Sequence, residues 1–375
     1  MVKREEITQA KRIIIKIGTR VITENDNTLN RNIIEKISCE VSKSHSDLKD
    51  FIIVSSGAIA LGLSRLGLDK RPEKINLLQA AASLGQSKLM HIYENEFGKN
   101  NIPIAQILLT YEDIQHRHRY LNVRNTIFSL WDYRAIPIVN ENDAVSFAEI
   151  RFGDNDMLAA HLSNMMDADL LIVLTDIDGL YNKNPILYSD AERLSVVNRI
   201  TEDVKAMAMG KGSNFSSGGM ASKLKAAEIA TKSGVGVVIT HGKYLNLKSI
   251  LSGEDIGTYF TPIKRRLKGK KKWIAFNPKV SGKIIVDKGG VKAIVDEKKS
   301  LLPVGIKDVV GDFKIGDNVA VLDEDGNEIA RGLTNFSSDE IKKIMGKKTS
   351  LIPKILNSDT YFDEVIHRDN LVIKV

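Results

Sequence analysis

Cysteine, proline and long apolar segments are scarce or absent in this sequence. Cys39 is the single cysteine among 375 residues, which excludes an intrachain disulfide bond and a zinc site built from several cysteines. With 8 prolines and 27 glycines the composition is neither collagen-like nor that of a chiefly disordered chain. No apolar run reaches the ~18–20 residues that span a bilayer, and the N-terminal residues lack the apolar stretch of a signal peptide. We therefore expect a cytoplasmic protein with no membrane partner.

Length and charge indicate how the chain is organised. At roughly 100–200 residues per domain, the length suggests two domains or three. The formal net charge is +7, from 54 basic and 47 acidic residues. The segment Lys264–Lys272 alone holds seven basic residues and no acidic one, so the rest of the chain is formally neutral. The positive charge therefore marks one short segment and does not indicate a nucleic-acid-binding surface over the whole protein.

The first two thirds of the chain alternate short apolar runs with amphipathic segments. Continuous β-branched runs are typical of parallel strands buried on both faces, and the segments between them have the spacing of surface helices. This alternation predicts an α/β domain over residues 1–262, with helices on both faces of a mainly parallel open sheet. The strands are expected at Ile13–Ile15, Phe51–Val54, Ile104–Leu109, Ile136–Val139, Leu170–Leu174 and Val235–Ile239, and two helices at Asp156–Ala168 and Met220–Ser233.

The pattern changes after Trp273. Short strands with tight turns predict a small β-rich domain over residues 274–352, preceded by a basic linker at 263–273 and followed by a C-terminal extension at 353–375. Asp325-Gly326 between two apolar runs is a hairpin signal. The strands are expected at Lys283–Val286, Lys292–Val295, Val319–Leu322 and Glu328–Ala330, and a helix at Ser338–Met345.

Two motifs of the first domain combine lysine with glycine. Lys16 ends the first expected strand and is followed by Gly18-Thr19, which places a cation and free backbone N–H groups where phosphate binds. Ser217-Gly218-Gly219 precedes a helix with Lys223 one turn inside it, which is a second candidate phosphate cradle. A surface lysine next to a turn glycine would give the first of these patterns as well. The P-loop pattern, a G-x-G-x-x-G after the first strand and the nucleophile elbow G-x-S-x-G are all absent.

Three further motifs are rich in small or polar residues. Ser55-Ser56-Gly57 lets a ligand approach the backbone closely. Asn140–Asp143 and Gly153–Asp156 gather carboxylates and carboxamides that can bind an ammonium group or hold lysines in place. Turns and helix caps use the same residue types, so a structural explanation stays open. Ligands of open α/β sheets bind beyond the carboxyl ends of the strands, which is where these motifs fall.

Together these motifs resemble the amino acid kinase family, and within it the branch that phosphorylates the side-chain carboxylate of glutamate. The β-rich tail resembles the PUA domain that many bacterial members of this branch append. The match covers about residues 10–260 and is carried by Lys16–Thr19, Ser55–Ile59, Asn140–Asp143, Gly153–Asp156, Leu174–Tyr181 and Gly218–Lys223. The resemblance implies a three-layer α/β/α sandwich that converts ATP and L-glutamate to ADP and L-glutamyl 5-phosphate, the first step toward proline.

The resemblance also implies roles for individual residues. As catalytic residues, Lys16 and Lys223 would neutralise the transferring phosphoryl group and Asp156 would hold both lysines. The substrate-binding residues would be Ser56, Gly57, Asp143 and Asn155. The ATP-binding residues would be Lys16, Gly18, Thr19, Thr175, Asp176, Ser217, Gly218, Gly219, Met220, Ala221, Ser222 and Lys223. Mg²⁺ would be held mainly by ATP phosphates and water, so no residue is assigned to a metal.

Other implied properties concern partners. The family resemblance implies feedback inhibition by proline and a homo-oligomer, either dimer or tetramer. One alternative is another member of the family acting on a different carboxylate. A second is an RNA-binding protein acting through the PUA-like domain, which would use basic residues with aromatic side chains to stack bases. For stacking the tail offers Trp273, Phe276 and Phe313, which is a small set, so the kinase is the favoured interpretation.

Overall fold

The computed structural model describes residues 4–24, 28–45, 47–68, 70–146, 155–209, 219–263, 269–357 and 362–374. They form two compact units, one up to residue 263 and the other from residue 269 onward. Each unit has its own sheet and its own hydrophobic core, as expected of separate domains. Of the helices in the described residues, none combines the length and apolar character needed to cross a bilayer.

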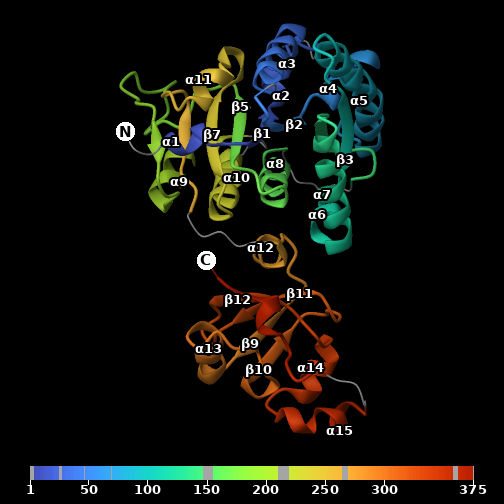
Figure 1. The fold of residues 1–375 in the computed structure, drawn as a ribbon, viewed down its shortest axis with the longest axis vertical. Coiled ribbons are helices and arrows are strands. Elements are labelled where there is room, and N and C mark those ends of the chain that lie inside the picture. The colour runs from blue at the N-terminus through green and yellow to red at the C-terminus, as the bar shows by residue number, and fades with distance from the viewer. Residues whose placement is uncertain are drawn as a thin grey trace. The chain divides into compact units, whose positions relative to one another are not determined.

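The first unit is built around a mainly parallel sheet (Figure 1). The strand order is β3-β4-β2-β1-β5-β7-β8-β6, and each neighbouring pair from β3 to β7 is parallel. β8 runs antiparallel to β7, and the short β6 pairs with β8 in parallel. The strands are β1 (Arg12–Ile17), β2 (Asp50–Ser55), β3 (Ile104–Leu109), β4 (Ile136–Glu141), β5 (Leu170–Thr175), β6 (Val196–Val197), β7 (Gly236–His241) and β8 (Thr258–Phe260). All six expected strands of this domain are confirmed.

Helices cover both faces of this sheet. On one face α3 packs beside α5 and α11, and on the other α8 packs against α10; Figure 1 shows the two sets above and below the strands. The helices are α1 (Glu5–Thr8), α2 (Thr19–Ile22), α3 (Arg31–His45), α4 (Ala58–Arg65), α5 (Ile75–Gly98), α6 (Tyr111–Gln115), α7 (Arg117–Asp132), α8 (Asn155–Met165), α9 (Glu202–Met209), α10 (Met220–Lys232), the short η2 (Gly242–Tyr244) and α11 (Leu247–Leu251). The predicted α/β architecture, with helices on both faces of the sheet, is therefore confirmed.

The side chains of β1 separate the core from the candidate site. Ile13, Ile15 and Ile17 point into the core shared with α3 and α5. Successive residues of a strand face opposite sides of the sheet. Lys16 therefore points to the other face, where it meets α8. One β-branched run thus buries an apolar face and also sets the direction of a lysine.

Helices α4 and α5 pack with their backbones in contact. A Cβ atom at Gly62 would lie 1.7 Å from the carbonyl oxygen of Ala81, and one at Gly85 would lie 1.8 Å from that of Ala58. Both distances are far inside van der Waals contact, so only glycine fits at these two positions. The contact holds the start of α4, which follows Gly57, firmly against the middle of α5.

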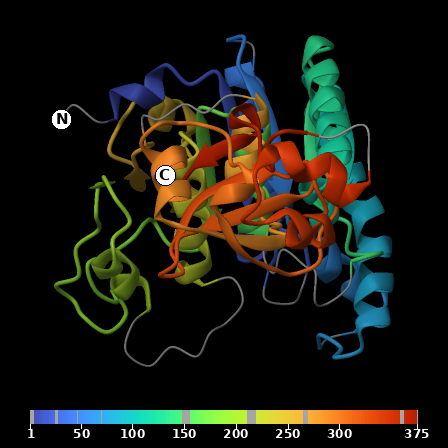
Figure 2. The same cartoon turned by 90° about the horizontal axis from the view of Figure 1, so that it is seen from below.

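The second unit, orange to red in Figures 1 and 2, contains a mixed sheet of order β10-β9-β11-β12-β13. β9 and β11 are parallel, and the other neighbours are antiparallel. Its elements are α12 (Gly269–Phe276), β9 (Gly282–Val286), α13 (Lys288–Val295), η3 (Pro303–Gly305), β10 (Ile306–Val310), β11 (Asn318–Leu322), β12 (Glu328–Leu333), α14 (Ser338–Ile344), η4 (Thr349–Leu351), α15 (Ile352–Leu356), η5 (Arg368–Asn370) and β13 (Leu371–Ile373). The predicted hairpin is the β11–β12 pair, and the predicted helix is α14.

The strand predicted at Lys292–Val295 is wrong, because these residues end helix α13. The helix begins after Asp287, whose side chain accepts a hydrogen bond from the backbone N–H of Gly290 at 2.7 Å. Ile294 is fully buried, and Val291 and Val295 pack against the same core. This spacing of three and four residues belongs to a helix, and the short β-branched run concealed it.

Two segments outside residues 274–352 are part of the second unit. Helix α12 begins at Gly269, inside the expected linker, and it buries Trp273. The backbone oxygen of Ile274 accepts a hydrogen bond of 3.1 Å from Asn318. Near the other end, β13 pairs with β12 and so completes the sheet.

The contact between α4 and α5 predicts the effect of a single methyl group. Gly85→Ala should lower the free energy of unfolding of the first unit by about 3 kcal/mol, because it forces two helix backbones apart. Urea unfolding followed through Trp131 fluorescence, in a Trp273→Phe background, measures this for the first unit alone.

Gly98 at the end of the same helix serves as the control. A Cβ there meets nothing within 4 Å, so Gly98→Ala should leave stability unchanged or raise it by up to ~1 kcal/mol. Equal effects of the two substitutions would contradict the proposed backbone contact.

Candidate active site

Three charged side chains from three elements meet on the α8 side of the sheet. Lys16 comes from the end of β1, Asp156 from the first turn of α8, and Lys223 from the first turn of α10. The Lys16 Nζ atom lies 2.5 Å from Asp156 Oδ1, and the Lys223 Nζ atom lies 3.1 Å from Asp156 Oδ2. Lys16 and Lys223 lie more than 200 positions apart in the sequence, with Asp156 between them, and the parallel sheet brings all three into one cluster.

This cluster lies in a buried place. Only 2% of Lys16, 0% of Asp156 and 5% of Lys223 is exposed. Removing a charge from water costs several kcal/mol, and attraction between opposite charges offsets part of that cost. Asp156 pairs with both ammonium groups and so holds them close to each other. Two lysines held in place by one carboxylate are the arrangement expected of a site for a phosphoryl group.

Asn155 links the charged cluster to a group of polar side chains. Its Nδ2 atom lies within hydrogen-bonding distance of three acceptors: the Ser55 carbonyl oxygen at 3.1 Å, Ser56 Oγ at 3.0 Å and Asn140 Oδ1 at 2.9 Å. Asn140 in turn donates to Gln86 Oε1 at 2.9 Å. Because Asn155 and Asp156 are consecutive on α8, the amides and the lysines have a fixed spacing.

The start of α4 lies beside this group. Gly57 adopts φ of +100°, a conformation in which a side chain is strained, and a Cβ there would lie 2.9 Å from Ile22. Glycine is therefore required between Ser56 and the helix. The expected substrate residues Ser56, Gly57 and Asn155 are thus brought together by β2, α4 and α8.

Asp143 lies in the turn after β4 and faces a cavity of about 580 Å³. The wall of the cavity is formed by α5, the ends of β3 and β4, and the turn itself. Its lining residues are Ala58, Ala82, Ser83, Gln86, Ser87, Met90, His91, Glu94, Gln106, Leu108, Asn140, Glu141, Asn142, Asp143 and Ala144. Gln86 and Asn140 belong both to this wall and to the amide chain, so the cavity adjoins the Asn155 group.

The expected nucleotide residues after β5 form a second polar group. Thr175 Oγ1 donates to Asp176 Oδ1 at 2.9 Å, and Arg20 of α2 pairs with Asp176 Oδ2 at 3.1 Å. Burial raises the pKa of Asp176, but the hydrogen bonds from Arg20 and Thr175 outweigh it and hold the pKa below its ordinary value. The carboxylate therefore stays ionised at neutral pH.

Gly18 and Thr19 lie between the lysine cluster and α2. The N–H of Gly18 donates to the Leu174 carbonyl oxygen at 3.1 Å, and a Cβ at Gly18 would lie 3.2 Å from that oxygen and 3.8 Å from Lys16 Nζ. Gly18 thus keeps the backbone close to both β5 and the ammonium group. Thr19 begins α2.

The remaining expected nucleotide residues lie at the start of α10. Gly219 precedes the helix, and Met220, Ala221 and Ser222 form its partly exposed first turn together with buried Lys223. Ser217 and Gly218 lie outside the described residues, so their expected contacts stay predictions.

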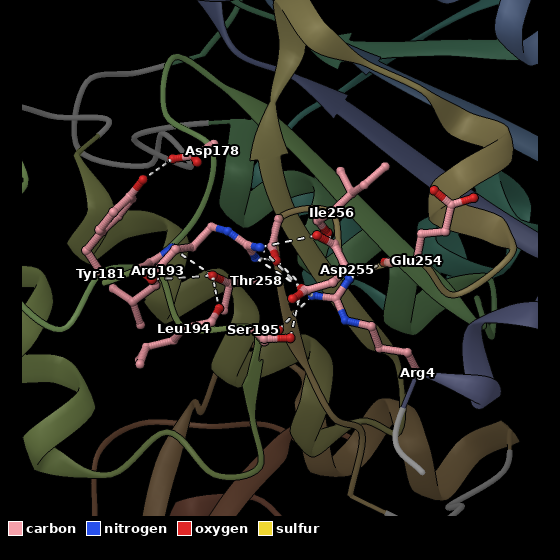
Figure 3. Close-up of polar contacts among 12 residues, drawn as sticks. Arg4, Asp178, Tyr181, Arg193, Leu194, Ser195, Glu254, Asp255, Ile256 and Thr258 are labelled. Carbon is pink, nitrogen blue, oxygen red and sulfur yellow. Dashed lines mark hydrogen bonds and ion pairs between the residues drawn. The ribbon is translucent and has the colours of Figure 1, made fainter. Parts of the chain in front are cut away.

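The loop that follows Asp176 is held by a network of arginines (Figure 3). Arg4 donates to the carbonyl oxygens of Ser195, Glu254, Ile256 and Gly257 at 2.6–2.9 Å and pairs with Asp255 at 2.8 Å. Arg193 also binds Asp255 and the Gly257 carbonyl oxygen. Next to them, Thr258 Oγ1 accepts from the Leu180 N–H at 2.8 Å and donates to the Leu194 carbonyl oxygen at 2.6 Å. The N-terminal segment therefore supports the loop that begins at the candidate nucleotide residues.

Gln86, Asn140 and Arg4 belong to these networks but were not among the predicted site residues. For Gln86 a signal exists, because the buried face of α5 runs through Ala82 and Leu89 and has a polar residue at the intervening position. Asn140 was within a noted motif but was not singled out. Nothing in the sequence marks Arg4, whose partners lie about 190–250 residues away.

Family comparisons agree with this geometry. The profile of the Amino acid kinase family matches residues 11–241, and that of the PUA domain matches residues 282–356. The chain belongs to the amino acid kinase family and carries a C-terminal PUA domain.

Relatives over nearly the full length share one name, Glutamate 5-kinase. The protein of Thermoanaerobacter sp. (strain X514) is 46% identical over 363 residues, covering 96% of this chain and 97% of its own. That of Geobacter sulfurreducens is 46% identical over 368 residues, covering 98% of each chain. That of Syntrophotalea carbinolica is 43% identical over 373 residues, covering 99% of this chain and all of its own. Among solved structures, the UMP kinase of Bacillus anthracis covers 67% of this chain and 96% of its own at 15% identity, with a TM-score of 0.47.

The arginine network predicts a stability effect far from the lysine cluster. Arg4→Met should lower the free energy of unfolding of the first unit by about 2–4 kcal/mol, because hydrogen bonds to charged groups contribute about 1.5–3 kcal/mol each and the stranded carbonyl groups only partly regain water. Arg4→Lys should recover little of this, since one ammonium group cannot reach four carbonyl oxygens from separate segments.

Arg20→Met is the matched control for urea unfolding. The Arg20 side chain is 79% exposed, and exposed ion pairs typically contribute below about 1 kcal/mol. An Arg4→Met protein as stable as the Arg20→Met protein would show that the network does not stabilise the unit.

Proposed function

We propose that this protein transfers the γ-phosphoryl group of ATP to the side-chain carboxylate of L-glutamate, giving ADP and L-glutamyl 5-phosphate. The observation that carries the proposal is the buried cluster in which Asp156 pairs with both Lys16 and Lys223. Family membership and full-length relatives named Glutamate 5-kinase support it.

The chemistry needs positioning and charge neutralisation more than proton transfer. An ordinary glutamate side chain titrates near ~4.3, so at neutral pH its carboxylate is already a nucleophile and needs no base. A carboxylate oxygen attacks the γ-phosphorus, the bond to the β,γ-bridging oxygen breaks, and ADP leaves with the electron pair. Two anions must approach each other in this step. Lys16 and Lys223 offset their repulsion, and Asp156 keeps both ammonium groups in place before substrate arrives.

The polar group around Asn155 is assigned to glutamate. Ser56, Gly57 and Asn155 surround the point where β2 meets α4, and Asp143 lies in the cavity wall. Asp143 supplies a carboxylate for the substrate ammonium group. Glutamate then extends from Asp143 toward the lysines, with its side-chain carboxylate nearest to Lys16.

The residues after β5 and at the start of α10 are assigned to the nucleotide. Thr175 and Asp176 contact it, Gly18 and Thr19 let its phosphates approach the backbone, and Ser217 to Lys223 wrap them. Mg²⁺ enters as Mg·ATP. Among the described residues, no three His, Cys, Asp or Glu side chains gather closely enough to hold a metal ion.

The remaining proposals concern the cellular setting and come from the sequence and the family. We propose a cytoplasmic homo-oligomer that catalyses the first step from glutamate toward proline and is inhibited by proline. Binding of RNA through the PUA domain stays a prediction, since no contact in the described residues bears on it.

The function is tested by trapping the acyl phosphate. Purified protein, Mg·ATP and hydroxylamine are incubated separately with L-glutamate, L-aspartate and N-acetyl-L-glutamate, and hydroxamate is measured. We expect hydroxamate with L-glutamate alone. Signal with another acid would refute the substrate and keep the reaction class. No signal from folded, ATP-binding protein would refute the kinase assignment.

The lysine cluster predicts the effect of removing one cation. Lys223→Ala should lower kcat for glutamate phosphorylation by at least ~10²-fold, because a preorganised charge in a buried site contributes this much to transition-state stabilisation. Lys225→Ala is the control, since Lys225 is an exposed lysine on the same helix. Turnover that is similar in both variants would remove Lys223 from the catalytic residues.

A further inference from the structure

Gln86 carries a buried hydrogen-bond donor for which the described residues supply no acceptor. The residue is 8% exposed and lies in the cavity wall. Its Oε1 atom accepts from Asn140, but its Nε2 atom has no hydrogen-bond partner within the part of the chain that the structure describes. Buried amide groups in native proteins are nearly always satisfied, so an unused donor beside a cavity points to a ligand oxygen.

The neighbours of Gln86 show which end of its amide is oxygen and which is nitrogen. Asn140 Oδ1 lies 2.9 Å from both the Glu141 backbone N–H and Asn155 Nδ2, so it is an acceptor. Asn140 Nδ2 must then be the donor toward Gln86, and the atom of Gln86 that receives it must be oxygen. Within the described residues, the Nε2 group therefore ends the series of hydrogen bonds that links Ser56, Asn155, Asn140 and Gln86.

The charge of the cavity restricts what this donor can meet. The described lining contains the carboxylates of Glu94, Glu141 and Asp143 and the imidazole of His91, and it includes no lysine or arginine. A simple anion would be repelled here. The cavity favours a ligand that carries an ammonium group next to a hydrogen-bond acceptor. The carboxylates attract the ammonium group, and the neutral Gln86 amide can donate a hydrogen bond to the acceptor without adding charge. The head group of an α-amino acid has this arrangement.

We propose that the cavity holds the α-amino acid end of the substrate, and that Gln86 Nε2 donates a hydrogen bond to its α-carboxylate while Asp143 faces the ammonium group. The last side-chain torsion of glutamine is soft, so the covered amide can turn toward an entering carboxylate. Gln86 then makes the enzyme specific for acceptors that carry a free α-carboxylate. This inference rests on the proposed function.

The experiment compares two acceptors that differ at one group. L-Glutamate carries an α-carboxylate, and 4-aminobutyrate is the same molecule without it. Initial rates with saturating Mg·ATP give kcat and KM for both acceptors, and the KM for ATP is measured at saturating L-glutamate. If 4-aminobutyrate is turned over too slowly, its inhibition constant against L-glutamate gives the same comparison.

Gln86→Leu removes both the donor and the acceptor of the amide. We expect kcat/KM for L-glutamate to fall about 10- to 100-fold, mainly through KM, because a hydrogen bond to a charged group is lost. The kcat/KM for 4-aminobutyrate and the KM for ATP should each change less than about threefold. Gln79→Leu makes the same substitution two turns earlier on α5, outside the cavity lining, and should leave both acceptors unaffected.

Gln86→Glu separates recognition from a structural role. It preserves size and the oxygen that accepts from Asn140, but it places a carboxylate where the donor was. We expect the Gln86→Glu enzyme to bind L-glutamate more weakly than the Gln86→Leu enzyme does. We expect it to bind 4-aminobutyrate more tightly than the wild-type enzyme does. A Gln86→Glu enzyme with wild-type constants, or equal losses for both acceptors in either variant, would overturn the proposal. Absence of glutamate hydroxamate with the wild-type protein would instead refute the proposed function.

Discussion

The contact on which the site depends is the double ion pair of Asp156 with Lys16 and Lys223. Each partner is almost fully buried, and burial of any one of them alone would be strongly unfavourable. The three elements that supply them must therefore assemble together, which couples the end of β1 to the first turns of α8 and α10. The same arrangement holds two ammonium groups in fixed positions close to each other. Structural stability and readiness for an anionic ligand thus follow from one carboxylate shared by two lysines.

The neighbouring amides extend this arrangement away from the lysines. Asn155 and Asp156 are adjacent on α8, so the polar chain to Ser56, Asn140 and Gln86 begins where the ion pairs end. Backbone contact between α4 and α5 prevents the two helices from sliding past each other. The ion pairs and the amide chain both start from the first turn of α8, so that helix sets the spacing between them.

Sequence patterns predicted the parallel sheet because its strands are continuous β-branched runs, and they predicted Lys16, Asp156 and Lys223 because motifs at strand and helix ends resemble a known family. Local patterns failed where distant residues decide the outcome. The segment ending at Val295 reads as a strand until the cap by Asp287 and the burial of Ile294 are known. Asn140 and Gln86 form a pair across 54 positions, and no local feature of either residue indicates the other.

The Arg4 network determines when the first unit can finish folding during synthesis. Arg4 emerges from the ribosome early, but three of its carbonyl partners lie 250–253 residues later. At about 5–20 residues per second, synthesis of the intervening chain takes on the order of 10–50 s. During that interval the charged end of Arg4 is bound by water or by passing groups, and the loop after β5 lacks its support. The first unit therefore reaches its final structure only after its last strand, β8, has been translated.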